Sequence, residues 1–264
     1  MQTMQPPELA VIRAAQERLR GIAVRTPLVR MDGVTTRPEP SAHDAARLEP
    51  LAAAAFRNPP RHDASDTEIY LKLETLQPIG SFKVRGAGNA LRSAAARDLR
   101  AGVWTPSAGN MAQGVAWNAR KLQVKCTAVV PEAAPRTKLA ALDRLGARVL
   151  RVPFESWWES VETHRADAVD GMLIHPVSNA AVVAGNATIG LEIFEDLPDV
   201  DTVLVPYGGG GLSVGIAAAL RALRPGVRIF ACEVETAAPL AAAFAAGAPT
   251  NIDHHRSFVD GIGS

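Results

Sequence analysis

Short apolar runs of strand length recur along the chain and alternate with longer stretches rich in Ala, Leu and Arg. The runs read IYLKL (69–73), GVWTP (102–106), CTAVVP (126–131), ARVLRVP (147–153), MLIHP (172–176), TVLVP (202–206) and VRIFACE (227–233). Strands of this length, separated by helical stretches, are typical of parallel β/α architecture. We therefore expect an α/β fold.

The alternation breaks between residues 31 and 68, where prolines lie among charged and small residues. Only the portion DAARLEPLAAAAF (44–56) favours a helix, and a short one. Proline-rich stretches without apolar periodicity are typical of loops. We interpret residues 31–68 as a surface insertion and expect it to be mobile.

The composition narrows the classes of function. A chain of 264 residues with a net charge of +1 has no excess of basic side chains to neutralise nucleic-acid or membrane phosphates. No apolar run approaches the ~18 residues that indicate a membrane span, and the first residues lack the pattern of a secretory signal. We expect a cytoplasmic protein that acts on a small molecule and contacts neither nucleic acid nor membrane.

A glycine loop, defined as Gly208–Gly211, follows the run TVLVP and precedes an Ala- and Leu-rich helical stretch. Consecutive glycines let backbone amides turn toward an anion, and a helix start adds partial positive charge. A flexible loop is the alternative, but a position between strand and helix favours a phosphate cradle. The loop lacks a P-loop lysine and the spaced glycines of a dinucleotide fingerprint, so we expect one cofactor phosphate.

A second turn, the serine turn Ser107–Asn110, ends the run GVWTP and precedes another helical stretch. Amides and a hydroxyl at such a helix start suit a carboxylate, and the Asn110 side chain can bond a ring hydroxyl. Taken alone, the turn favours simple helix capping.

Lys83 is one of five lysines among 28 basic residues, and it lies among small residues in GSFKVRGAG. Most lysines are simply solvated. An amine near small residues and aromatic surface loses solvation, however, and becomes a nucleophile toward aldehydes. A lysine, a phosphate cradle and a carboxylate-binding turn together predict a pyridoxal 5'-phosphate enzyme that acts on amino acids.

The motifs ETLQPIGSFKVRGA, SAGNMAQGVA, VVPEAAPRTKLAALDRLGARV, HPVSNAAVVAGNATIGLEI, VDTVLVPYGGGGL and SFVDGIG occur in this order. In combination they resemble the serine/threonine dehydratases of the fold-type II pyridoxal phosphate enzymes, which share the tryptophan synthase β fold. The resemblance covers most of the chain from about Arg25 to Gly263, apart from the insertion. It implies two open parallel-type α/β domains with the cofactor in the cleft between them. The implied large domain comprises residues 1–101 and 179–264, and the small domain residues 102–178.

The resemblance also implies roles for individual residues. Lys83 is the implied Schiff-base and catalytic lysine, Phe82 packs beside the pyridine ring, and Asn110 bonds the ring hydroxyl. The implied cofactor-binding residues are Phe82, Lys83, Asn110, Gly208, Gly209, Gly210, Gly211 and Leu212. The implied substrate-binding residues are Ser107, Ala108, Gly109, Asn110 and Met111, with the backbone around Gly109 and Met111 taking part.

Several positions depart from the family pattern. Met111 stands where many members have histidine, and HPVSN and AGNAT replace HPFDD and GQGT, which leaves the preference between threonine and serine open. Family members also continue beyond the position of Ser264 with a segment that contacts the pyridine nitrogen. We therefore expect the carboxyl-terminal part of the large domain to be missing.

The implied activity is α,β-elimination of threonine or serine to a 2-oxo acid and ammonia, by a homodimer. The alternatives are a serine or other amino-acid racemase, another fold-type II enzyme, and a truncated, non-catalytic cofactor-binding protein. Racemases of this family carry a second serine in a Ser-Ser-Gly-Asn turn, where this chain has Ala108. No inversion of the substrate is therefore expected.

We expect no metal site. Some relatives hold a divalent cation through a carboxylate like that of Glu233 and a second acid six positions on, but that position is Pro239. A hard cation needs several oxygen ligands, and the six histidines show no spacing typical of metal ligands.

Overall fold

A computed structural model describes residues 4–31, 67–253, 255, 258–259 and 261–262. The chain divides into two compact units, one of Met1–Thr26 with Glu74–Ser264 and one of Pro27–Leu73. This division does not follow the expected domain boundaries at residues 101/102 and 178/179, which stay a prediction. The expected insertion at 31–68 lies outside the described residues except at its ends.

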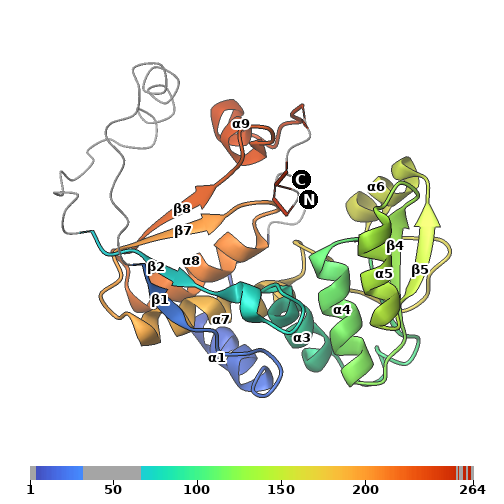
Figure 1. Ribbon diagram of the computed structural model, residues 1–264, viewed down its shortest axis with the longest axis horizontal. Helices are drawn as coiled ribbons and strands as arrows, with labels where there is room; N and C mark the ends of the chain where they lie inside the picture. Colours follow the sequence, from blue (N-terminus) through green and yellow to red (C-terminus); the bar gives the residue numbers. More distant parts are fainter. Residues whose placement is uncertain (1–3, 32–66, 254, 256–257, 260, 263–264) are drawn as a thin grey trace. The chain divides into compact units, whose positions relative to one another are not determined.

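The larger unit alternates helices and strands along the chain (Figure 1). Its helices are α1 (Leu9–Arg18), the 3-10 helix η2 (Glu74–Leu76), α3 (Lys83–Ser93), α4 (Asn110–Lys121), α5 (Arg136–Arg144), α6 (Phe154–Thr163), α7 (Ala180–Asp196), α8 (Gly211–Leu223) and α9 (Pro239–Ala246). Its strands are β3 (Val103–Thr105), β4 (Cys126–Pro131), β5 (Arg148–Val152), β6 (Met172–Leu173), β7 (Thr202–Pro206) and β8 (Arg228–Cys232).

One sheet of the larger unit has the strand order β5-β4-β3-β6, and all its pairs are parallel. Val103 on β3 pairs with Cys126 on one side and Met172 on the other, which sets the register at the centre. Helices α4, α5 and α6 contact these strands. Apolar runs between helices thus became parallel strands, as the sequence predicts.

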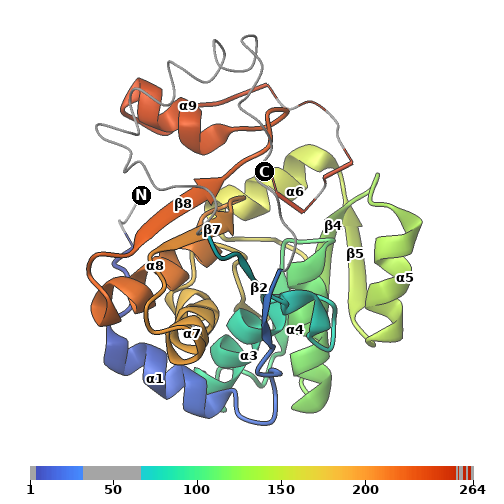
Figure 2. The ribbon, with the colours of Figure 1, turned by 60° about the vertical axis from the view of Figure 1, so that its left-hand side comes forward.

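A second parallel pair, β7 and β8, is joined through α8 and forms a βαβ unit (Figure 2). Apolar side chains of β7, α7 and α8 share a core that includes Ile189, Val205, Ile216 and Leu220. The predicted α/β fold class is confirmed.

The strands described in the smaller unit pair in antiparallel fashion. Strand β1 (Leu28–Arg30) pairs antiparallel with β2 (Tyr70–Lys72), and Leu28 lies opposite Lys72. The run IYLKL is a strand, but the expectation that it belongs to parallel architecture is wrong. Its partner β1 has only three residues, too few to show a period in the sequence.

Helices α3, α7 and α8 of the larger unit pack with their backbones in close approach. A Cβ atom on Gly185 would lie 2.5 Å from the Arg85 carbonyl oxygen, and one on Gly215 would lie 2.8 Å from the Val183 carbonyl oxygen. Only glycine permits such contacts, because any side chain would push the helices apart. This packing fixes the starts of α3 and α8, which carry the predicted lysine and glycine loop.

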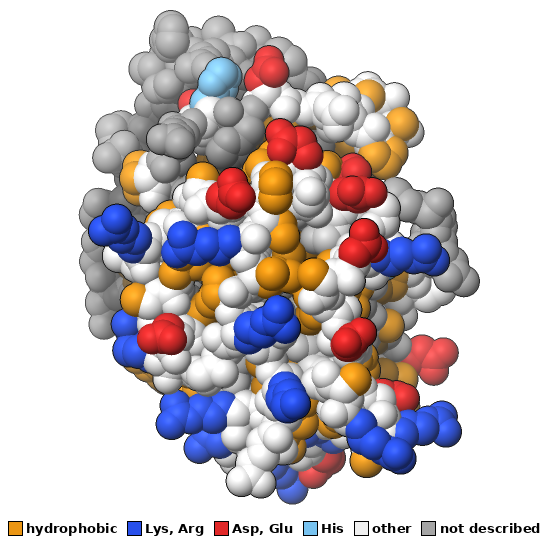
Figure 3. Space-filling model, turned by 90° about the vertical axis from the view of Figure 1, so that its right-hand side faces the viewer, with side chains coloured by type: hydrophobic (Ala, Val, Ile, Leu, Met, Phe, Trp, Pro, Cys, Tyr) orange, Lys and Arg blue, Asp and Glu red, His pale blue; other side chains and the backbone are white. Residues whose placement is uncertain are grey.

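Side chains of both signs are interspersed with apolar ones on the described part of the face in Figure 3. Such a mixture gives this face no single-sign field of the kind that attracts nucleic acids. Among the described helices, none has the length and apolar character needed to cross a membrane.

Candidate active site

Lys83 is the first residue of α3 and follows a tight turn. Gly80 has φ +69°, a conformation that glycine adopts readily, and the Lys83 amide donates to the Ser81 hydroxyl over 3.3 Å. The side chain is half-buried, and its Nζ lies 5.0 Å from the centroid of the Phe82 ring. Burial lowers the pKa of Lys83 to about 8. At pH 7 about a tenth of this amine is therefore uncharged and nucleophilic, far more than for a solvated lysine.

Helix α4 packs directly against the backbone of Lys83. A Cβ atom on Gly114 would lie 2.8 Å from the Lys83 carbonyl oxygen. One turn further on, the buried Asn118 donates its Nδ2 to the Val84 carbonyl over 3.1 Å. These contacts hold the start of α3 against the middle of α4, so that the serine turn lies about one helical turn from the contact with Lys83.

The serine turn follows the last residue of β3. The Gly109 amide donates to the Ser107 hydroxyl over 3.2 Å, which leaves the hydroxyl proton free to be donated elsewhere. Asn110 opens α4 and is exposed, whereas Met111 is 2% exposed and packs in the core. Met111 can therefore offer its backbone to a ligand at this turn but not its side chain.

The glycine loop, between β7 and α8, combines a positive φ with close packing. Gly210 has φ +86° and caps α8, and a Cβ atom on Gly209 would lie 2.3 Å from Val177 Cγ1. Among the described residues, the amides of the loop donate no hydrogen bond to another group. Unpaired amides at the start of a helix of 13 residues attract an anion such as a phosphate.

Asn186, a residue that the sequence reasoning missed, connects the glycine loop with the helix of Lys83. It is fully buried on α7, and its Nδ2 donates to the Gly211 carbonyl over 3.3 Å. Its Oδ1 has no partner and would lie 2.6 Å from a Cβ atom on Gly86, one turn after Lys83. The sequence offered one signal for this residue, because a single asparagine within the apolar stretch AAVVAGNATIG indicates a buried polar side chain.

Phe82 and Leu212 meet in one apolar cluster. Both pack, partly buried, against the buried residues around Val205 and Ile216. The aromatic ring beside Lys83 and the first turn of α8 thus share the same core. Two residues predicted from separate motifs are brought together.

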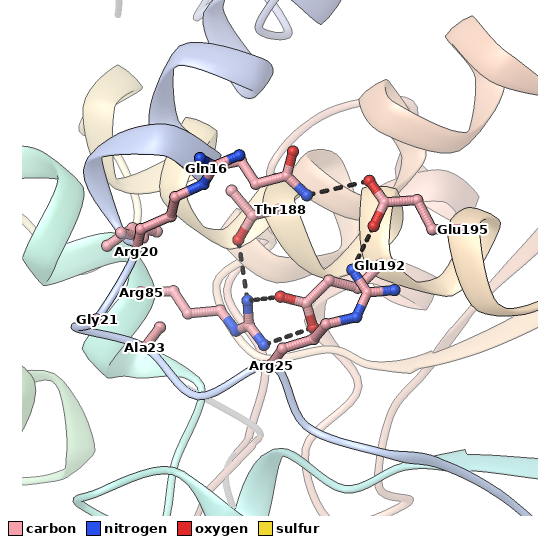
Figure 4. A pocket seen from close by; sticks show the side chains of 10 residues that line it. Gln16, Arg20, Gly21, Ala23, Arg25, Arg85, Thr188, Glu192 and Glu195 are labelled. Carbon is pink, nitrogen blue, oxygen red and sulfur yellow. Dashed lines mark hydrogen bonds and ion pairs between the residues drawn. The ribbon is translucent and has the colours of Figure 1, made fainter.

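A buried network around Arg85 was also missed. Arg85 is 1% exposed and binds Glu74 through Nε and Nη2, each over 2.8 Å. It also binds Glu192 through Nη1 and Nη2 over 2.6 and 2.9 Å, as Figure 4 shows. It also donates to the Thr188 hydroxyl and the Val24 carbonyl. Burial works to lower the pKa of Arg85, but the bonds to both carboxylates outweigh it and raise the pKa. The network joins the segment before Lys83 to α7.

The network borders a hollow of ≈ 450 Å³ that contains none of the predicted site residues. Gln16, Glu195 and Arg25 line it, and Arg25 is paired with Glu195 (Figure 4). Arg25 is also paired with Asp196. Because these side chains satisfy one another, we assign the hollow no part in the chemistry.

Within the described residues no cluster of three or more His, Cys, Asp or Glu side chains is placed to hold a metal. The Glu233 carboxylate accepts the amides of Leu240 and Ala241 over 2.7 and 2.9 Å. It therefore caps the start of α9.

Comparison with known proteins shows what the chain is similar to. Residues 51–264 match the family described as pyridoxal-phosphate dependent enzymes. The L-threonine ammonia-lyase of Thermotoga maritima is 38% identical over 197 residues, which cover 74% of this chain and 49% of that protein. The catabolic L-threonine dehydratase TdcB of Escherichia coli K12 is 40% identical over 192 residues, 72% of this chain and 57% of that protein. The chain thus spans about half to three fifths of the length of these curated relatives.

The fold is shared with solved enzymes as well. The serine racemase of Dictyostelium discoideum superimposes with a TM-score of 0.73 at 31% identity, over 92% of this chain and 71% of that one. These matches confirm the predicted fold-type II architecture.

Proposed function

The chain belongs to the family of pyridoxal-phosphate dependent enzymes, and from this premise we propose that it is a threonine/serine dehydratase. The proposed reaction converts L-threonine to 2-oxobutanoate and ammonia, or L-serine to pyruvate and ammonia. The observation that carries the proposal is Lys83, a half-buried amine with a pKa lowered to about 8 at the start of α3.

The residues present fit the cofactor. The unpaired amides of the glycine loop and the start of α8 suit its phosphate, and the required glycine at position 209 supports this. Lys83 would hold its aldehyde, Phe82 and Leu212 would pack near its ring, and Asn110 would bond its hydroxyl. Bound pyridoxal phosphate supplies an electron sink for a carbanion at the substrate α-carbon.

Lys83 supplies the base in this proposal. Its amine takes the proton from the α-carbon, which requires the uncharged form, and a pKa near 8 makes that form accessible at physiological pH. The close contact of Gly114 with the Lys83 backbone fixes the position of the backbone from which the lysine side chain extends. A base held in place by packing needs no reorganisation when the proton moves.

The serine turn binds the substrate carboxylate in this proposal. The Ser107 hydroxyl has a free proton because its oxygen accepts the Gly109 amide, and the first-turn amides of α4 add further donors. The half-buried Ala108 between them carries only a methyl group and cannot deliver a proton. This favours elimination over racemisation, although serine racemases share the fold.

A cytoplasmic location and a homodimeric assembly complete the proposal, and the assembly rests on the family resemblance. Light scattering of the purified chain and fractionation of the producing cells test them. The site itself is tested by adding pyridoxal phosphate, reducing with borohydride and locating the added mass by peptide mass spectrometry. We expect it on Lys83. Mass on any other lysine would contradict the proposed site, and no added mass would contradict the cofactor assignment.

A further inference from the structure

Tyr207 stands between the end of β7 and the glycine loop. Its amide donates to the Cys232 carbonyl over 2.8 Å and so extends the pairing of β7 with β8. The outer edge of its ring lies against the loop, since a Cβ atom on Gly210 would lie 3.2 Å from the Tyr207 hydroxyl oxygen. The backbone of Tyr207 is thus fixed by β8, and its phenol group is directed toward Gly210.

No hydrogen bond joins the Tyr207 hydroxyl to another described residue, and its electrostatic surroundings consist of burial and the charge of Glu233. The side chain is half-buried, and burial raises the pKa of Tyr207, as does the nearby Glu233 charge. The hydroxyl is therefore protonated at neutral pH and has a proton to donate. No hydrogen bond joins the hydroxyl to Glu233, whose carboxylate is held at the start of α9 by the amides of Leu240 and Ala241.

We propose that the Tyr207 hydroxyl binds the cofactor phosphate as a donor in addition to the amides of the glycine loop. This inference rests on the proposed function. A phosphate dianion has more acceptor sites than the loop amides fill, and hydrogen bonds to an ionised acceptor are among the stronger ones. Tyr207 would therefore help to retain the cofactor by binding the cofactor's phosphate and not its pyridine ring.

The test compares the affinities of Tyr207→Phe and wild type for pyridoxal phosphate and for pyridoxal, which lacks the phosphate. Tyr207→Phe should weaken pyridoxal phosphate binding about tenfold, the usual effect of a bond to a charged group, and leave pyridoxal binding unchanged. Tyr70→Phe is the matched control, since its hydroxyl binds Glu68 in the other compact unit. Unchanged pyridoxal phosphate affinity, or equal loss for both ligands, would overturn the inference.

A second measurement needs no variant at Tyr207. The chain has two tyrosines, so labelling their Cζ atoms with carbon-13 gives two signals, which Tyr70→Phe assigns. We expect pyridoxal phosphate, but not pyridoxal, to shift the Tyr207 signal. If both ligands bind and neither shifts it, Tyr207 has no part in phosphate binding. If wild type binds neither ligand, the proposed function itself is wrong.

Discussion

The guanidinium group of Arg85 and the carboxylate of Glu192 are joined by two hydrogen bonds, 2.6 and 2.9 Å long, inside the protein. Arg85 lies two residues after Lys83 on α3, and Glu192 lies on α7, which also carries Asn186. Glu74 completes the network from the segment that leads into the lysine turn, which is the tight turn at Gly80 just before Lys83. The pair therefore locks together the two helices on which the lysine and the glycine loop depend.

Replacing Arg85 with Met should lower the free energy of unfolding by about 3–5 kcal/mol, because it leaves two carboxylates without their counter-charge. Urea denaturation measures the loss. Arg25→Met is the control, since its partners Glu195 and Asp196 lie at the surface and an exposed pair contributes about 1 kcal/mol or less. Equal, small losses in both variants would show that the buried network does not stabilise the fold.

The capture of pyridoxal phosphate by the cofactor-free chain should depend on pH through Lys83. The uncharged amine is the reacting form, so the capture rate should rise with pH and level off above about 8. A solvated lysine would give a rate that still rises toward pH 10. Stopped-flow absorbance measures the rate, with Lys125→Ala as a control that keeps the wild-type profile. A profile that still rises well above pH 9 would contradict the lowered pKa.

Gly209→Ala should distort the glycine loop, because the added Cβ would lie 2.3 Å from Val177 Cγ1. We expect the affinity for pyridoxal phosphate to fall tenfold or more, as the loop amides no longer converge on the phosphate. Gly226→Ala is the matched control, since its Cβ would meet no atom within 4 Å. Fluorescence titration compares the two. Wild-type affinity in Gly209→Ala would mean that the phosphate binds elsewhere.

We expect Ala108 to favour elimination over inversion. Racemisation needs an acid on the substrate face opposite Lys83, and the methyl group of Ala108 cannot donate a proton. Chiral chromatography of unreacted L-serine after partial turnover should show no appreciable D-serine with wild type and a measurable amount with Ala108→Ser. Accumulation of D-serine by wild type at a rate comparable to ammonia release would favour the racemase reading.

The parts of the fold that were predictable are those that local sequence dictates. β-branched runs such as TVLVP became strands, and the glycine loop lies between β7 and α8, because the local sequence strongly favours these backbone conformations. The same holds for the lysine turn, where Gly80 adopts a positive φ. The residue roles themselves, from Phe82 to Leu212, remain predictions that the geometry supports.

The parts that escaped prediction depend on contacts between distant segments. Arg85 is 107 residues from Glu192, and nothing within GSFKVRGAG indicates that its charge will be buried. Asn186 contacts Gly211 only because glycines let α3, α7 and α8 approach closely. A three-residue strand such as β1 leaves no periodic signal, so its antiparallel pairing with β2 could not be expected.

The most direct test of the account is turnover by the purified chain with pyridoxal phosphate and L-threonine or L-serine. We predict release of 2-oxo acid and ammonia in equal amounts by wild type, and a loss of several orders of magnitude in Lys83→Ala, which lacks the nucleophile and the base. Lys125→Ala should keep wild-type turnover. Wild type that binds the cofactor but releases neither product, or Lys83→Ala with undiminished turnover, would contradict the claim that Lys83 carries out a dehydratase reaction.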